Sequence, residues 1–267
     1  MASGPNVKAN LAEAEKLIGT AVAQAAELVV LPENFAIMGM AEKDKVMQAE
    51  SQDDGPIQDF LREQARKHQI WLVGGTVPLA AAESGKVYAS CQLYDSQGER
   101  VAQYNKIHLF DVTIEANNER YHESETTAAG DEIVVVDTPF GRLGLAVCYD
   151  LRFPELFRNM ADQGMEICAL PSAFTAMTGK AHWEPLLRAR AIENLCFMVA
   201  AAQGGYHVSG RETHGDSMIV DPWGVILNRL PHGTGVVVAD LDAEMLARTR
   251  ENFPSLQHRR LSGARAG

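Results

Sequence analysis

Cysteine is scarce in this sequence. The 267 residues include four cysteines, none of which forms a CxxC pair. This density argues against a secreted, disulfide-stabilised framework. No HExxH motif and no close cluster of Cys and His occurs, which argues against a structural metal site. We therefore expect a reduced, cytoplasmic protein without a bound metal.

Long apolar runs and excess positive charge are also missing. No apolar run approaches ~18 residues, and no basic region precedes an apolar core at the N-terminus, so we expect neither a membrane span nor a secretory signal. The formal net charge is −11. This charge repels phosphate backbones and anionic membranes, so nucleic acid and membranes are not expected partners. An anionic small molecule is not excluded, because one buried arginine can dominate the local field.

The remaining composition is that of a globular protein with a large core. Hydrophobic residues make up 46% of the chain and charged residues 22%. No Ser/Gly-rich linker, charge block or repeat divides the sequence. We therefore expect a single domain over residues 1–267.

The hydrophobic pattern predicts alternating helices and strands. Helices are predicted over residues 8–26, 58–68, 183–195 and 242–251, and another begins near Pro154. Strands are predicted at 28–31, 71–73, 166–170, 197–202 and 236–241. Hairpins are predicted to pair 88–95 with 99–107, 133–137 with 142–147, and 217–221 with 225–229. This mixture indicates an α/β protein with a mixed sheet and helices covering at least one face.

Cys148 lies at the end of one apolar strand, residues 143–147, and just before the helix near Pro154. Such a turn presents a side chain at the carboxyl edge of a sheet, where catalytic groups gather. Free backbone N–H groups at the coming helix can bind an oxyanion and favour a thiolate. The alternative is a buried cysteine acting as a small hydrophobe, which is the commoner case for a lone cysteine.

Two charged residues also follow predicted strands. Glu33 comes directly after the strand at 28–31, and Lys106 lies at the end of the strand at 99–107. Alone, each is more often a solvated loop charge. Together with Cys148 they supply an acid, a base and a nucleophile at strand ends. None of the eight histidines lies in a cysteine-protease signature, so a Cys–His hydrolase is a remote alternative.

Three segments of the chain resemble the signature regions of the nitrilase (carbon–nitrogen hydrolase) superfamily, and they occur in the family's order. They are Leu-Pro-Glu-Asn-Phe at 31–35, Asn-Lys-Ile-His-Leu-Phe-Asp at 105–111 and Cys-Tyr-Asp-Leu-Arg-Phe-Pro-Glu at 148–155. The resemblance covers nearly the whole chain. It implies a four-layer αββα sandwich with mixed sheets, no cofactor, and dimers formed through the helices after Cys148 and around Arg188.

The resemblance also assigns roles by position. Glu33 is similar to the general base, Lys106 to the lysine that stabilises the tetrahedral intermediate, and Cys148 to the nucleophile. Glu123 matches the family's second glutamate, which supports Lys106. The oxyanion would be held by the Lys106 ammonium and a backbone N–H group, for which Tyr149 is the candidate.

A finer match concerns the substrate. The segments at 171–174, 178–179, 181–184, 187–193 and 220–224 resemble the branch that hydrolyses deaminated glutathione. The related ω-amidase branch acts on α-ketoglutaramate, and both substrates carry an α-keto carboxylate. In that branch the arginine four residues after the nucleophile, here Arg152, contacts the carboxylate, and Thr178 lies near it. A guanidinium suits a carboxylate. The alternative for Arg152 is an ion pair with Glu155 or Asp150.

Other functions on the same residues remain open. A nitrile or N-carbamoyl hydrolase could use the same triad, although the finer segments disfavour it. A non-catalytic metabolite-binding protein is disfavoured because all four family residues are present.

The chain departs from the family pattern at two places. Family members usually carry an apolar strand just before the position of Ser3, and Asp216 stands where the family often has His. Because the strand at 28–31 reads as interior, we expect that the natural protein begins several residues upstream. The His-to-Asp difference puts any role borrowed from that position in doubt.

Overall fold

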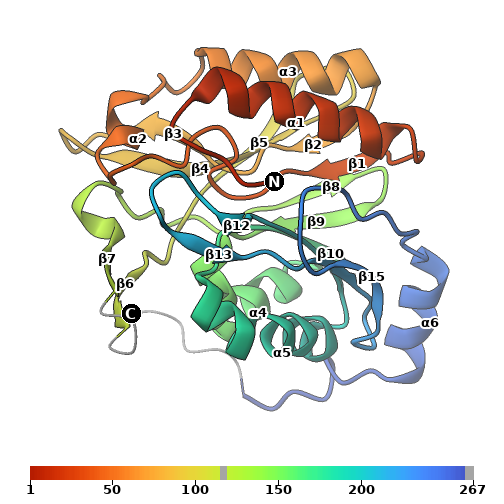
Figure 1. Ribbon diagram of the computed structural model, residues 1–267. Helices are drawn as coiled ribbons and strands as arrows, with labels where there is room; N and C mark the ends of the chain where they lie inside the picture. Colours follow the sequence, from red (N-terminus) through yellow and green to blue (C-terminus); the bar gives the residue numbers. More distant parts are fainter. Residues whose placement is uncertain (115–118, 262–267) are drawn as a thin grey trace.

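A computed structural model describes residues 1–114 and 119–261 as two sheets packed face to face between helices (Figure 1). Helices α1 (Val7–Val22) and α3 (Pro56–His68) cover the first sheet, and α4 (Pro154–Asp162) and α5 (Ala176–Asn194) cover the second. The predicted four-layer αββα architecture with mixed sheets is confirmed. No helix among these residues is long and apolar enough to cross a membrane.

The first sheet has the order β1-β2-β4-β3, with β5 also paired to β4. Strands β1 and β2 are parallel, and the other pairs are antiparallel. The strands are β1 (Leu28–Val30), β2 (Trp71–Val73), β3 (Val77–Ala80), β4 (Val87–Tyr94) and β5 (Arg100–Asn105). The predicted β4–β5 hairpin is present.

The second sheet has the order β15-β14-β11-β10-β9-β8. Its middle strands β9, β10 and β11 are parallel, as expected for a sheet buried on both faces. Both of its predicted hairpins are present. The strands are β8 (Val135–Thr138), β9 (Gly141–Leu145), β10 (Ile167–Ser172), β11 (Phe197–Ala202), β14 (Ser217–Val220) and β15 (Ile226–Leu230).

Several short elements frame the open end of the sandwich and were not predicted. They are α2 (Asp44–Met47), the β6–β7 pair (Asp111–Ile114 with Glu119–His122), the β12–β13 pair (Gly204–Tyr206 with Glu212–His214) and the 3₁₀ turns η2 (Glu123–Glu125) and η3 (Cys148–Arg152). Helix α6 (Ala243–Asn252) follows the second sheet. These elements are too short to leave a periodic signal in the sequence.

Capping residues set where the helices begin. The Asn6 side chain accepts a hydrogen bond from the Ala9 N–H at the start of α1, and Pro56 occupies the first turn of α3. Helix α5 begins at residue 176, seven residues before the predicted start at 183, because Thr175 caps it there. The prediction used the helical spacing of apolar residues and no capping residue, so it missed this start.

The edge of the first sheet differs from the prediction in two ways. Within the part of the chain that the structure describes, strand β1 pairs only with β2, so it is an edge strand and not an interior one. Residues 236–241, predicted as the last strand, form no strand. A cavity of about 500 Å³ lies between β1 and this segment, and Met1, which is 7% exposed, lines it. Both segments were predicted as strands from their apolar residues. Whether such a segment forms hydrogen bonds in a sheet depends on which other strand lies beside it.

Candidate active site

Cys148 stands at a sharp turn where the chain leaves the second sheet. It follows β9 and opens η3 with φ +47°, in the left-handed region that few non-glycine residues adopt. Backbone strain of this kind is characteristic of functional sites. The residue is 8% exposed, and its Sγ accepts a hydrogen bond from the Ala173 N–H at 3.4 Å. The turn therefore holds one sulfur atom at a fixed point in the pocket.

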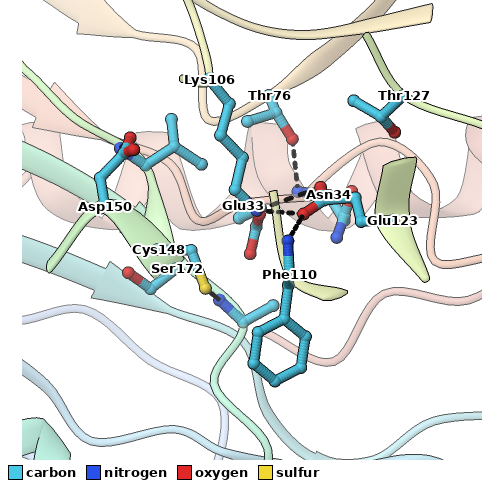
Figure 2. A network of polar contacts seen from close by, with 12 residues as sticks. Glu33, Asn34, Thr76, Lys106, Phe110, Glu123, Thr127, Cys148, Asp150 and Ser172 are labelled. Atoms are coloured by element: carbon cyan, nitrogen blue, oxygen red, sulfur yellow. Dashed lines mark hydrogen bonds and ion pairs between the residues drawn. The ribbon is translucent and has the colours of Figure 1, made fainter. Parts of the chain in front are cut away.

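Lys106 is buried between two carboxylates. Its Nζ donates to Glu33 Oε1 at 2.8 Å and to Glu123 Oε1 and Oε2 at 3.1 and 2.9 Å. Figure 2 shows these three side chains converging on one side of the Cys148 sulfur. The lysine is 2% exposed. The structure thus brings the four residues singled out in the sequence into one group.

The protonation states follow from burial and charge. Burial lowers the pKa of Lys106, but Glu123 and Glu33 outweigh this and hold the pKa well above its usual value. Burial raises the pKa of Glu123, but Lys106 outweighs this and holds it below its usual value. Burial, followed by the negative charge of Glu33, raises the pKa of Cys148 well above that of a free thiol. The backbone N–H group of Ala173 lowers the pKa of this thiol, as expected, but burial and Glu33 outweigh its effect.

Backbone contacts fix the two carboxylates. Asn34, at φ +56°, donates its N–H to Thr76 Oγ1 at 2.8 Å and so anchors the turn that carries Glu33. Gly75 packs against this turn so closely that a Cβ there would lie 2.2 Å from the Pro32 carbonyl oxygen. A bulkier residue at position 75 would therefore displace Glu33.

Glu123 is held by a backbone group of its own. Its Oε2 accepts from the Phe110 N–H at 2.8 Å. One carboxylate thus binds both the lysine and the loop that follows it. Its orientation does not depend on the lysine alone.

Asp150 joins the two halves of the site and was considered in the sequence only as a partner for Arg152. Its fully buried carboxylate accepts from the Tyr104 hydroxyl at 2.7 Å, the Val147 N–H at 2.8 Å and the His108 N–H at 3.1 Å. The His108 ring Nδ1 lies 2.7 Å away. Tyr104 and His108 flank the lysine, and Val147 precedes the nucleophile. No local sequence pattern signals such a contact between distant segments.

Arg152 pairs with neither Glu155 nor Asp150, so the ion-pair alternative is wrong. Its guanidinium lies 5.1 Å from the centre of the Phe174 ring and 5.7 Å from that of Tyr149. Its Nη1 is 3.1 Å from His182 Nδ1. Burial lowers its pKa, but an arginine stays charged at neutral pH.

Thr178 lies in the first turn of α5. The Thr175 hydroxyl caps this turn, accepting from the Thr178 N–H at 3.3 Å, and the two hydroxyl oxygens are 2.8 Å apart. The backbone N–H of Tyr149, at the second position of η3, belongs to the first turn, where N–H groups have no acceptor within the helix. This is the group proposed from the sequence as an oxyanion donor.

The residues singled out in the sequence line one pocket of about 350 Å³: Glu33, Lys106, Glu123, Cys148, Tyr149, Arg152 and Thr178. Arg211, which the sequence reasoning missed, lines it as well, whereas Asp216 does not. The Asp216 carboxylate binds Arg229 through both oxygens, which indicates a structural ion pair. Among residues 1–114 and 119–261, no group of three His, Cys, Asp or Glu side chains is placed to hold a metal ion.

Comparisons with known proteins point to one family. The family model for carbon-nitrogen hydrolases matches residues 1–251. A Synechocystis protein named deaminated glutathione amidase is 46% identical over 262 residues, which are 97% of this chain and 95% of that protein.

Two solved structures have similar folds. The NitFhit protein of Caenorhabditis elegans is 40% identical with a TM-score of 0.89, and the match covers 97% of this chain and 63% of that one. A mutant amidase from Nesterenkonia sp. AN1, solved after acrylamide had added to its active-site cysteine, is 27% identical with a TM-score of 0.78, and 95% of both chains is covered.

Proposed function

Because the chain belongs to the carbon–nitrogen hydrolase family, we propose that it is an amidase that cleaves deaminated glutathione. One observation carries the proposal of amide hydrolysis: a buried ammonium, Lys106, lies between two carboxylates beside the Cys148 thiol. The name of the Synechocystis relative and the arginine in the pocket support the substrate. We propose that residues 1–267 act as one such domain.

In the first half of the proposed reaction, Glu33 takes the proton of the Cys148 thiol as the sulfur attacks the amide carbonyl carbon. The raised pKa of the thiol makes this proton transfer necessary. The carbonyl oxygen becomes an oxyanion, which the Lys106 ammonium and the Tyr149 N–H stabilise. The C–N bond then breaks, and the leaving amine takes the proton from Glu33. A thioester on Cys148 remains.

In the second half, Glu33 removes a proton from water, and the resulting hydroxide attacks the thioester carbonyl. The C–S bond breaks, the acid product leaves, and the thiolate recovers its proton from Glu33. Glu123 keeps Lys106 charged and in place through both halves. Every proton passes through one carboxylate, so no metal-bound water is needed.

We propose that Arg152 binds the α-keto carboxylate of the substrate, with Thr178 beside it. The guanidinium has no carboxylate partner in the described residues and lies against two aromatic rings at the pocket wall. Ring faces and a half-buried position strengthen a bidentate pair with a carboxylate. Keto-acid amides would then be preferred over neutral amides.

The function is tested with a kinetic panel of deaminated glutathione, α-ketoglutaramate, glutamine, a nitrile and an N-carbamoyl amino acid. The highest kcat/KM is expected for deaminated glutathione. A higher value for α-ketoglutaramate would make the protein an ω-amidase, and a higher value for the nitrile or the N-carbamoyl compound would point to the other hydrolases.

The nucleophile is tested by Cys148→Ala. The variant should stay folded, losing roughly 1 kcal/mol or somewhat more for the small cavity. Its turnover should fall below about 1% of wild type, as for other covalent nucleophiles. Higher residual turnover, measured with the protein's thermal melting as the folding control, would exclude Cys148 from this role.

We also propose that the protein is a cytoplasmic homodimer. All four cysteines are free and buried, which suits a reducing compartment. The Arg188 Nε donates to the Gly224 carbonyl. Three apolar side chains near this contact are exposed: Ile192 at 46%, Trp223 at 59% and Phe253 at 50%. A patch of this kind marks an interface. Sedimentation of the wild type and of Trp223→Glu should show a dimer and a monomer, respectively.

A further inference from the structure

Besides Arg152, the pocket is lined by Arg120, whose Nε contacts His122, and by Arg211, whose guanidinium is free to bind an anion. Lys106 is held by two carboxylates, and Lys45 pairs with Glu42 at 2.7 Å. Arg211, like Arg152, lines the pocket without an ion pair to any described residue. In a protein of net charge −11 carboxylates outnumber basic groups, so an arginine in a pocket without a carboxylate partner indicates a binding site for an anion.

Arg211 lies beside the nucleophile but on a different element from Arg152. It sits in the turn between β12 and β13, and its Nη2 donates to the Ala173 carbonyl at 3.1 Å. The N–H of Ala173 in turn reaches Cys148 Sγ at 3.4 Å. Ala173 therefore links the Arg211 guanidinium to the Cys148 sulfur through two hydrogen bonds.

The Arg211 guanidinium is positioned but not satisfied. It lies 5.1 Å from the centre of the Tyr121 ring, which restricts its plane. Its Nε is buried without an acceptor among the described residues, and Ala173 is the acceptor of Nη2 alone. A buried donor without an acceptor is unfavourable, and a carboxylate can accept two hydrogen bonds from one guanidinium.

Two unpaired guanidiniums beside one nucleophile suit a substrate with two carboxylates. Deaminated glutathione has one on the α-keto acid half and another on the glycine of its cysteinylglycine half. These carboxylates lie on opposite sides of the scissile amide. In an extended two-residue leaving group, the second carboxylate lies within about 7 Å of the scissile nitrogen. A guanidinium one residue from the sulfur is at a suitable place for it.

We propose that Arg211 binds the carboxylate of the leaving amine and so selects dicarboxylate substrates with a peptide-like leaving group. This inference rests on the proposed function, in which Arg152 binds the carboxylate of the acyl half. It separates deaminated glutathione from α-ketoglutaramate, because the leaving group of the latter is ammonia, which has no carboxylate. Arg211 is thus a specificity-determining residue.

The test compares three substrates that share one acyl half: deaminated glutathione, the same compound with its glycine carboxylate converted to a carboxamide, and α-ketoglutaramate. In the wild type, kcat/KM should fall about 10- to 100-fold from the acid to the carboxamide, the range expected for a charge-assisted pair. Arg211→Gln should remove this difference between the acid and the carboxamide, mainly through KM. Arg211→Lys should recover part of the preference, because it keeps the charge.

Each other result overturns the inference in a recognisable way. Equal wild-type kcat/KM for acid and carboxamide refutes the Arg211 site while leaving the amidase intact, and this comparison stands even when a variant does not fold. Equal losses for all three substrates in Arg211→Gln assign the residue a structural role in the β12–β13 turn. A wild type inactive on all three refutes the proposed function itself, and the Arg211 proposal falls with it.

Discussion

The buried carboxylate of Asp150 provides a sharp test of how the site is assembled, through the substitution Asp150→Asn. Oδ1 accepts from the His108 N–H and Oδ2 from the Val147 N–H, so an amide NH₂ meets a backbone donor in either orientation. Burial raises the pKa of Tyr104 far above its usual value, so the hydroxyl stays protonated and can donate to the Oδ2 position when the amide oxygen occupies it. The substitution leaves one backbone N–H and one amide N–H facing each other without acceptors.

Two buried unsatisfied donors cost roughly 1–3 kcal/mol each, or about 2–6 kcal/mol together. For a protein of this size the melting temperature should fall by roughly 2–4 °C per kcal/mol, which is at least about 4 °C. The control is Asp137→Asn, whose carboxylate is 86% exposed and pairs with the surface residue Arg142, so its effect should stay within about 0.5 kcal/mol. Both are measured by calorimetry.

Activity separates a positioning role from a purely structural one. Measured well below the melting transition, kcat of Asp150→Asn should fall more than KM changes, because the Lys106 and Cys148 segments are no longer tied to each other. A melting temperature equal to that of the control would refute the hydrogen-bond argument. A lowered melting temperature with unchanged kcat would show that Asp150 stabilises the fold without positioning the site.

Three further predictions concern single groups. Alkylation of Cys148 by iodoacetamide should be slow at neutral pH and should keep accelerating up to pH 9, because the thiol pKa is raised; a plateau near pH 7 would contradict this. Arg152→Lys should raise KM for α-keto-acid amides far more than for neutral amides, because lysine keeps the charge but loses the bidentate geometry, and equal losses would favour a structural role. Adding about six apolar residues before Met1 should raise the melting temperature by several degrees, because the added residues can pair with the edge strand β1. They would also move the N-terminal ammonium, whose pKa is lowered by burial, out of the protein interior. The control is an extension of alternating Asp and Pro residues, and equal melting temperatures for the two extensions would exclude strand addition.

Local sequence signals predicted the elements that carry the chemistry. Glu33 and Cys148 each follow an apolar strand, which is readable because burial leaves a run of apolar residues, whereas Lys106 follows β5, a strand of mixed residues that was predicted as half of a hairpin. Their order matched one family, which supplied the sandwich and the second glutamate. The residue types and their places in the chain were therefore sufficient to predict which groups meet.

The protonation of the site could not be read in the same way. The thiol of Cys148 was expected to favour its ionised form, whereas burial and the Glu33 charge raise its pKa. Desolvation depends on every atom packed around a group, and a linear sequence does not give that packing. The consequence is mechanistic, because a protonated thiol needs its base at the moment of attack.

Residues that act across the fold are also invisible to local patterns. Asp150 meets Tyr104 and His108 more than 40 positions away in the chain, and Arg211 reaches the nucleophile only through Ala173. Strand β1 shows the same limit, because its apolar residues predicted a strand but could not tell that one of its edges would face a cavity. In each case the sequence specifies what a residue can bind, while the fold decides which partner comes within reach. A search for specificity in this protein should therefore begin with the charged groups that the fold leaves without partners.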